Sequence, residues 1–167
     1  MKRSFLFAFI FFFIHFKGNS QKVVRENIRA LVEKTDSLYR NKCKAFSKLK
    51  KDVAGIPFTE AWEYFKSSSL YYFSVKYSID STDYNEEYYF DKEQLIFSAE
   101  KELYHFPSSK DSIGWSALYY FYHNKLIDYE TLGHGKSEMD DWNPEKEVLE
   151  RLAGRKKELS GIINNGN

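Results

Sequence analysis

Pairs of neighbouring carboxylates are the residues whose types and spacing best fit chemistry in this sequence. The pairs are Glu86 with Glu87, Glu100 with Glu102, and Asp140 with Asp141. Two carboxylates that face each other across a cleft can supply the general acid and the general base of glycan hydrolysis. On a strand, however, alternation would place Glu100 and Glu102 on the solvent face, where acids commonly serve solubility. A small hydrolase is therefore the alternative function rather than the first one.

The sequence contains no recognised nucleophile or metal motif. None of His105, His123 and His134 has the spacing of a His-Glu-x-x-His site or lies near a paired-cysteine site. His134 lies between two glycines with Asp140 and Asp141 downstream, but a loop histidine near acids is ordinarily solvated. No Gly-x-Ser-x-Gly elbow presents a serine. The sequence thus predicts neither a metal nor another cofactor.

One long amphipathic helix is predicted from Gln21 to about Val53, because apolar residues recur there three, four or seven apart. One stripe of this helix comprises Val32, Tyr39, Phe46 and Val53. The stripe would pack on a sheet, with a coiled-coil partner as the alternative. Gly55 and Pro57 would end the helix. Residues 58–66 fit either a short helix or a strand.

From Ser69 onward the apolar residues follow a period of two, which is typical of half-buried strands. Five strands are predicted, at residues 69–79, 84–91, 95–104, 115–122 and 126–132. A final helix begins at Asn143-Pro144 and ends before Gly161, and residues 164–167 form a frayed tail. The predicted fold class is α+β: a long N-terminal helix packed on a five-stranded antiparallel meander, followed by a short C-terminal helix.

Tyrosine is the residue type that points most clearly to binding, because it joins a large apolar ring to a polar tip. One set of strand aromatics would face inward under the N-terminal helix: Tyr71, Phe73, Tyr77, Tyr88, Phe90, Tyr119 and Phe121. Alternation then places Tyr72, Tyr89, Tyr120 and Tyr122 on the other face. We interpret these four as a candidate surface for a protein or peptide. The alternative is that the C-terminal helix covers them as a second core layer.

A pattern of Tyr-Tyr-Phe, turn, Leu-Ile occurs at residues 88–96 and again at 119–127. In this layout the chain resembles a set of small exported Bacteroidota proteins without an assigned function, over roughly residues 71–132. The resemblance implies paired hairpins under a helix, similar in shape to cystatin-like or PepSY-like folds, and implies no chemistry. The chain departs from that set at the turns, where Lys92-Glu93 and His123-Asn124 replace Asn-Gly. Because glutamate adopts positive φ reluctantly, a tight turn in the first hairpin is questionable.

The first twenty residues have the form of a secretory signal peptide. Lys2 and Arg3 precede an apolar run at residues 5–14, which is shorter than the roughly 20 residues that span a bilayer, and the small Ser20 suits a cut after it. An uncleaved signal anchor is the alternative. We therefore expect a single domain at residues 21–163, periplasmic or secreted, with no membrane span after cleavage.

Charge and cysteine content narrow the choice of partner. Removing residues 1–20 takes away three basic side chains and no acid, so 25 basic against 24 acidic side chains become 22 against 24. Near-neutrality argues against nucleic acid. Cys43 is the only cysteine, so no internal disulfide can form. We predict a non-catalytic exported protein that binds a protein or peptide of the cell envelope, including an enzyme or toxin that it inhibits.

Overall fold

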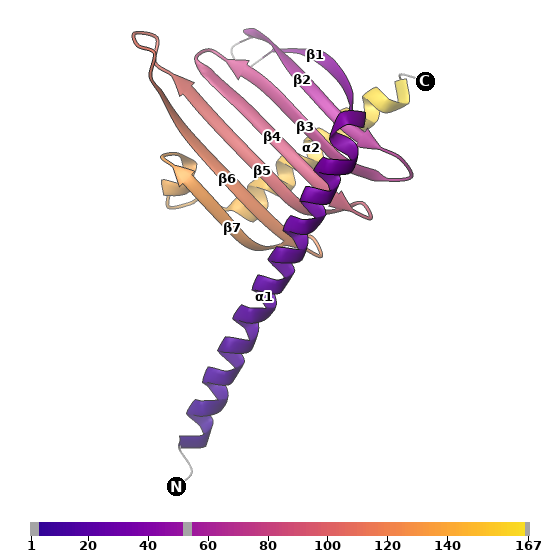
Figure 1. Ribbon diagram of the computed structural model, residues 1–167. Helices are drawn as coiled ribbons and strands as arrows, with labels where there is room; N and C mark the ends of the chain where they lie inside the picture. The colour runs from indigo at the N-terminus through magenta and orange to yellow at the C-terminus, as the bar shows by residue number, and fades with distance from the viewer. Residues whose placement is uncertain (1–3, 52–54, 166–167) are drawn as a thin grey trace.

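The computed structural model describes residues 4–51 and 55–165 (Figure 1). Seven antiparallel strands of the described residues form one sheet in sequence order. The strands are β1 (Lys44–Lys51), β2 (Pro57–Lys66), β3 (Leu70–Ile79), β4 (Thr82–Asp91), β5 (Gln94–His105), β6 (Ser112–Tyr122) and β7 (Lys125–Gly133). The α+β class is therefore correct, but the predicted five-stranded meander is wrong, because two further strands, β1 and β2, extend the sheet on one side.

Two helices lie on opposite faces of this sheet. In Figure 1, α1 (Ser4–Tyr39) crosses the front face and α2 (Pro144–Asn165) crosses the back face. The N-terminal part of α1 projects beyond the sheet. No helix among the described residues carries an apolar stretch long enough to cross a membrane.

β1 occupies residues that were predicted to continue the N-terminal helix. The helix instead ends at Tyr39, and a 3-10 turn, η1 (Arg40–Lys42), leads into β1. Phe46, Lys48 and Lys50 are half-buried while the residues between them are exposed, a period of two rather than 3.6. Lysine fits such a strand because its stem packs on the sheet while its charged end reaches a carboxylate. The predicted end of the helix at Val53 lies outside the described residues.

The ambiguous segment before Ser69 is also a strand. β2 buries Glu60 and Trp62 on one face, with the exposed Ala61 between them. Phe46 of β1 stacks on Trp62, with ring centroids 5.7 Å apart. Both N-terminal strands therefore belong to the same aromatic layer as the strands that the sequence did predict.

The two Tyr-Tyr-Phe repeats fold as equivalent hairpins. In each, the two turn residues, Lys92-Glu93 and His123-Asn124, have positive φ, as a tight type I′ turn requires. A tight turn is therefore present at Lys92-Glu93, although glutamate adopts positive φ reluctantly. After each turn the register shifts, so that Ile96 and Ile127 are each an extra residue on their strand. These β-bulges let Ile96 lie on the same side of the sheet as the adjacent Phe97, the side that faces α1.

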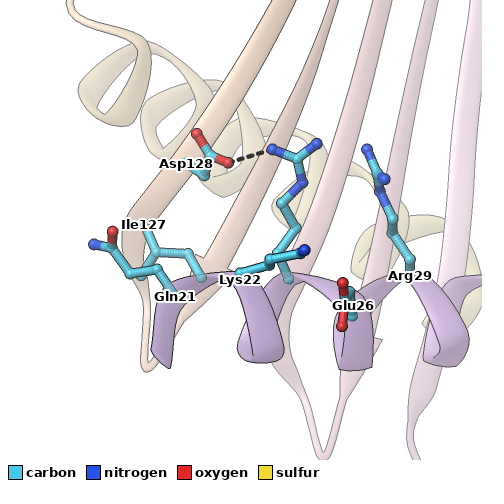
Figure 2. Close-up of a pocket in the computed structure, with 7 residues that line it drawn as sticks. Gln21, Lys22, Glu26, Arg29, Ile127 and Asp128 are labelled. Atoms are coloured by element: carbon cyan, nitrogen blue, oxygen red, sulfur yellow. Dashed lines mark hydrogen bonds and ion pairs between the residues drawn. The ribbon is translucent and has the colours of Figure 1, made fainter. Parts of the chain in front are cut away.

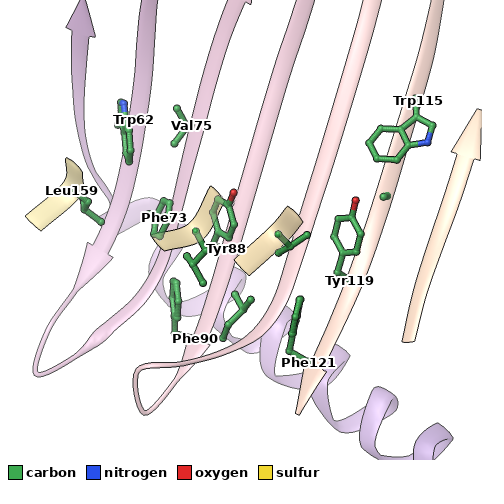
Figure 3. Packing of buried hydrophobic residues seen from close by; sticks show 13 residues of the cluster. Trp62, Phe73, Val75, Tyr88, Phe90, Trp115, Tyr119, Phe121 and Leu159 are labelled. Carbon is green, nitrogen blue, oxygen red and sulfur yellow. The ribbon is translucent and has the colours of Figure 1, made fainter. Parts of the chain in front are cut away.

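The face beneath α2 holds the larger core (Figure 3). Its buried aromatic residues are Trp62, Phe73, Tyr88, Phe90, Trp115, Tyr119 and Phe121. Val148, Leu152 and Leu159 of α2 pack against them. Most of these aromatics were predicted to pack under the N-terminal helix, and that prediction is wrong because α2 covers them. α1 instead covers the other face, which was predicted to be open or to lie under the C-terminal helix.

α2 begins as predicted at Pro144 and continues past its predicted end. Asn143 caps its first turn, since the side-chain oxygen accepts the Lys146 backbone N–H at 3.0 Å. The helix runs through Gly161 to Asn165, so part of the predicted tail is helical, and residues 166–167 lie outside the described residues. Burial of the apolar stripe against the sheet stabilises the helix across the glycine.

Candidate functional site

Three of the four predicted binding tyrosines are buried beneath α1. Tyr72, Tyr89 and Tyr120 are 3%, 2% and 1% exposed, and they form a second core with Ile28 of α1 and Phe97 of β5. The rings of Tyr72 and Tyr89 lie 4.8 Å apart. Burial raises the pKa of Tyr72 to about 12, which keeps its hydroxyl protonated at neutral pH.

Polar contacts at both ends of the α1–sheet contact complement this small apolar core. Arg29 Nε donates to the Tyr120 hydroxyl at 3.0 Å, and the Tyr89 hydroxyl donates to Asp36 at 2.9 Å. At the C-terminal end of α1, Tyr39 stacks on Phe65 of β2 at 4.2 Å. The tyrosine face is therefore closed by residues 24–39 of α1 and is not an open platform.

Tyr122 is the one predicted binding residue that lies at the surface, with 52% of its area exposed. It lines a groove of about 480 Å³ between α1 and the ends of the two hairpins. We call this the α1 groove, and its lining residues are Val24, Asn27, Ile28, Leu31, Asp91, Lys92, Gln94, Ile96, Phe121, Tyr122 and His123. The ring of His123 lies edge-on to that of Tyr122, at 4.1 Å, and restricts its orientation.

The repeats and α1 each supply one wall of the α1 groove. Helical spacing places Val24, Ile28 and Leu31 along one side of α1. The bulged Ile96 comes from the first hairpin, and Tyr122 comes from the strand end of the second. Because the tight turns leave both strand ends close to α1, the groove combines apolar side chains with the polar groups of two turns.

A second hollow, of about 380 Å³, lies where the first turns of α1 after Ser20 meet β7 (Figure 2). Its two arginines, Arg25 and Arg29, are already paired with carboxylates of β7. Arg25 donates to Asp128 at 2.6 Å and also contacts Glu130, and this hydrogen bond to Asp128 raises the pKa of Arg25. A negatively charged ligand would have to compete with both carboxylates for Arg25, so this hollow is the weaker candidate.

The carboxylates that could support hydrolysis lie on the other face, under α2. Glu86 and Glu100 are directly opposite each other on β4 and β5, and both are buried, which corrects the predicted solvent position of Glu100. Arg155 donates to Glu86 at 2.7 and 3.0 Å and to Glu60 at 2.5 Å. Arg151 binds both oxygens of Glu100, which also accepts the Tyr119 hydroxyl at 3.1 Å. These acids form a buried ion network that joins α2 to the sheet.

A catalytic acid must carry a proton at neutral pH, whereas the Glu100 carboxyl is ionised. Burial alone would raise the pKa of Glu100, but the hydrogen bonds and charges of Arg151 and Lys136 outweigh it, and the pKa is lowered. Glu102 lies two residues along β5, and burial raises its pKa despite the charge of Lys136. Glu100 therefore stays an ionised partner of Arg151.

The other polar candidates from the sequence remain at the surface. His134 Nδ1 lies 2.7 Å from Glu138, and both side chains are exposed. Within the described residues, no three His, Cys, Asp or Glu side chains come together as a metal site. Asp140 and Asp141 are exposed. Glu87 is the exception, because it is partly buried and its carboxylate lies 3.2 Å from the Tyr89 hydroxyl.

Sequence reasoning missed the α1 groove and the Arg151–Arg155 network. A signal for the network was present: Arg151 and Arg155 are four residues apart on an otherwise apolar stripe of the final helix, which places two charges toward the sheet. The groove had a weaker signal in the first repeat, where the adjacent apolar residues Ile96 and Phe97 can share one face of the sheet only through a bulge.

Comparison of the chain with protein-family models, with curated proteins and with solved structures gave no match. The resemblance to small exported Bacteroidota proteins therefore stays a prediction. The functional argument rests on the geometry of the α1 groove and its surroundings.

Proposed function

We propose that this chain is an exported, non-catalytic binding protein that holds a peptide segment of another envelope protein in the α1 groove. The observation that carries the proposal is the exposed Tyr122 at the rim of a groove whose interior is apolar. Exposed aromatics beside an apolar pocket are the usual energetic centres of protein contacts. We therefore place the binding surface at the α1 groove, which lies at the edge of the buried tyrosine face.

The lining of the α1 groove suits a peptide better than a charged metabolite. Ile28, Leu31 and Ile96 provide apolar contacts for an aliphatic or aromatic anchor side chain. Asn27 and Gln94 provide amides that can pair with a peptide backbone. Asp91 and Lys92 contribute one charge of each sign, so the groove has no strong preference for a charged ligand.

An envelope hydrolase remains the alternative function, but its support is weaker. Its best carboxylate pair, Glu86 and Glu100, is bound to Arg155 and Arg151 and lies beneath α2. Freeing either acid would break a buried ion pair.

Export rests on the n-region and the short apolar run of residues 1–20. The contacts that attach α1 to the sheet in the described side chains come from Val24 onward, so a cut after Ser20 would keep them. Mass spectrometry of the protein from the envelope and medium of the source cells tests this. A mature chain that begins at Gln21 is expected, and an intact chain beginning at Met1 in the cytoplasm would contradict export.

Co-purification with matched variants tests binding. Tyr122 and Tyr129 are both about half exposed, at 52% and 47%, but lie on opposite faces of the sheet, so Tyr129→Ala is the control for Tyr122→Ala. A partner recovered with the wild-type chain and with Tyr129→Ala should be lost with Tyr122→Ala. Equal recovery with both variants would place the binding surface elsewhere.

A further inference from the structure

We propose that the free edge of β1 binds an acidic, extended segment of a partner protein, which adds to the sheet as a further strand. This surface goes beyond the α1 groove and does not depend on it. β1 forms one edge of the sheet and β7 forms the other. Sheet edges present unpaired backbone groups and are a common site for peptide recognition by strand addition.

The pairing pattern shows which backbone groups of β1 point outward. The two residues that flank a two-residue hairpin turn form a hydrogen-bonded pair, so Ile79 and Thr82 bond across the Asp80–Ser81 turn. In antiparallel sheets such pairs alternate along a strand, and each residue bonds to one neighbour only. Following the register from β3 through β2, Phe46 and Lys48 bond to β2.

The backbone groups of Ala45, Ser47 and Leu49 consequently point away from the sheet. In the described part of the chain, no hydrogen bond joins these outward groups to another segment. Their side chains are small or exposed, with Leu49 69% exposed, so they do not themselves cover the edge. Three successive donor–acceptor positions are open to an added strand.

At the opposite edge, side chains already bond two of the outward N–H groups. The same alternation places the N–H groups of Leu126 and Tyr129 on the outer side of β7. Glu145 of α2 accepts the Leu126 N–H at 3.2 Å, and Asp128 accepts the Tyr129 N–H at 2.9 Å. Acidic side chains thus accept two outward N–H groups of β7, whereas no side chain of the described residues accepts those of Ala45, Ser47 and Leu49, so β1 is the more open edge.

The charge of β1 selects an acidic occupant. The strand contains Lys44, Lys48, Lys50 and Lys51 and no acid. Glu158 of α2 neutralises part of this charge, at 3.3 Å from Lys48 and 2.7 Å from Lys50. Edge lysines commonly prevent self-association, and here they would repel the β1 of a second copy. The same lysines attract a segment with carboxylates on alternate residues.

The two sides of β1 define the pattern of that segment. Lys48 and Lys50 lie on the α2 side, where an added strand would present its acidic residues. Leu49 lies exposed on the α1 side, where the intervening residues would be apolar. An alternation of acidic and β-branched residues meets both requirements.

Amide hydrogen exchange of residues 21–167, followed by NMR, tests the proposal. The probe is an acetylated, amidated octapeptide of alternating valine and glutamate, and the control replaces glutamate by lysine. The glutamate peptide should slow exchange at Ala45, Ser47 and Leu49 at least tenfold and leave Phe46 and Lys48 unchanged, because those already bond to β2. The lysine peptide should have no effect. Protection that rises with protein concentration in the absence of peptide would overturn the proposal in favour of a second copy.

Two variants separate backbone pairing from simple charge attraction. Ser47→Pro removes an outward N–H that bonds to nothing in the sheet, so the fold should persist while affinity for the glutamate peptide falls at least tenfold. Lys44→Glu with Lys51→Glu should reverse the preference toward the lysine peptide. Tyr122→Ala should bind the peptide like the wild type, since the groove is a separate surface. Unchanged affinity in the charge-reversed protein would overturn the proposal, whether or not Ser47→Pro folds.

Discussion

Replacing Arg151 by methionine should lower the free energy of unfolding by about 3 kcal/mol at neutral pH, because it leaves a buried carboxylate without its main partner. Arg151 binds both oxygens of Glu100, which is only 5% exposed. Breaking a buried pair on one side typically costs about 3–5 kcal/mol. We expect the lower end because Lys136 stays 2.5 Å from Glu100 and the Tyr119 hydroxyl still donates to it.

The pH dependence of this stability loss makes the prediction specific for the ionisation of Glu100. In the wild type the pKa of Glu100 is lowered, so its contribution to stability is present above the pKa of the unfolded chain and is lost as pH falls through the folded value. Without Arg151, burial should dominate and raise that pKa. The folded variant then takes up a proton more readily than the unfolded chain, and its deficit should shrink as pH falls from 7 to 5.

Urea unfolding at several pH values measures both effects. With a slope of about 2 kcal/mol per molar, the midpoint should fall by about 1.5 M at pH 7. Lys146→Met removes an exposed charge from the same helix and should change the free energy of unfolding by less than about 0.5 kcal/mol. Adding Glu100→Gln to Arg151→Met should recover much of the loss, since the amide needs no counter-charge. A deficit that is the same at pH 5 and pH 7, or that Glu100→Gln deepens, would refute the reasoning.

Three further substitutions test the packing and the turns. Ile28→Ala should cost about 2 kcal/mol in urea unfolding, because Ile28 is the one buried side chain among residues 21–39 of α1 and packs in a contact that is otherwise partly exposed. Gly133→Ala should lower the free energy of unfolding by about 3 kcal/mol. The cause is a φ of +90° and a new Cβ 2.0 Å from a neighbouring carbonyl oxygen, and thermal unfolding measures the loss. Changing Lys92-Glu93 to Asn-Gly should raise the free energy of unfolding by about 1 kcal/mol, since both residues have positive φ. The melting temperature should rise accordingly.

Matched controls exist for the first two of these substitutions. Val23 is exposed on α1, so Val23→Ala should have little effect on stability. Gly55 also has a positive φ, of +85°, but no atom near its missing Cβ, so Gly55→Ala should cost only about 1 kcal/mol. Equal losses at Gly133 and Gly55 would contradict the close approach at Gly133, and a loss at Val23 equal to that at Ile28 would contradict the burial of α1.

The strands from Leu70 onward could be predicted because alternation of tyrosine, valine and polar residues is a local signal. β1 could not be predicted in the same way, since Tyr39 and Phe46 are seven residues apart, and this spacing favours a helix stripe although Phe46 lies on a strand. Only the pairing of Phe46 with Trp62 across β1 and β2 resolves that ambiguity, and this contact is not local.

The two-sided nature of the sheet was predicted, but not which helix covers which side. Alternation separates Tyr88 from Tyr89, yet it carries no information on the helix that each one contacts. The choice depends on distant pairs between helix and sheet, such as Tyr89 with Asp36 of α1 and Glu100 with Arg151 of α2. For this reason only Tyr122 of the four predicted binding tyrosines lies at the surface, and the other three are buried in the core.

The most direct test of the central claim is site-specific photo-crosslinking from the α1 groove in the envelope of the source cells. A photoreactive phenylalanine at position 122 should crosslink to one partner segment with an apolar anchor residue, and the same probe at the exposed position 129 on the other face should not. A crosslink of equal yield from both positions, or from position 129 alone, would contradict a binding site in the α1 groove.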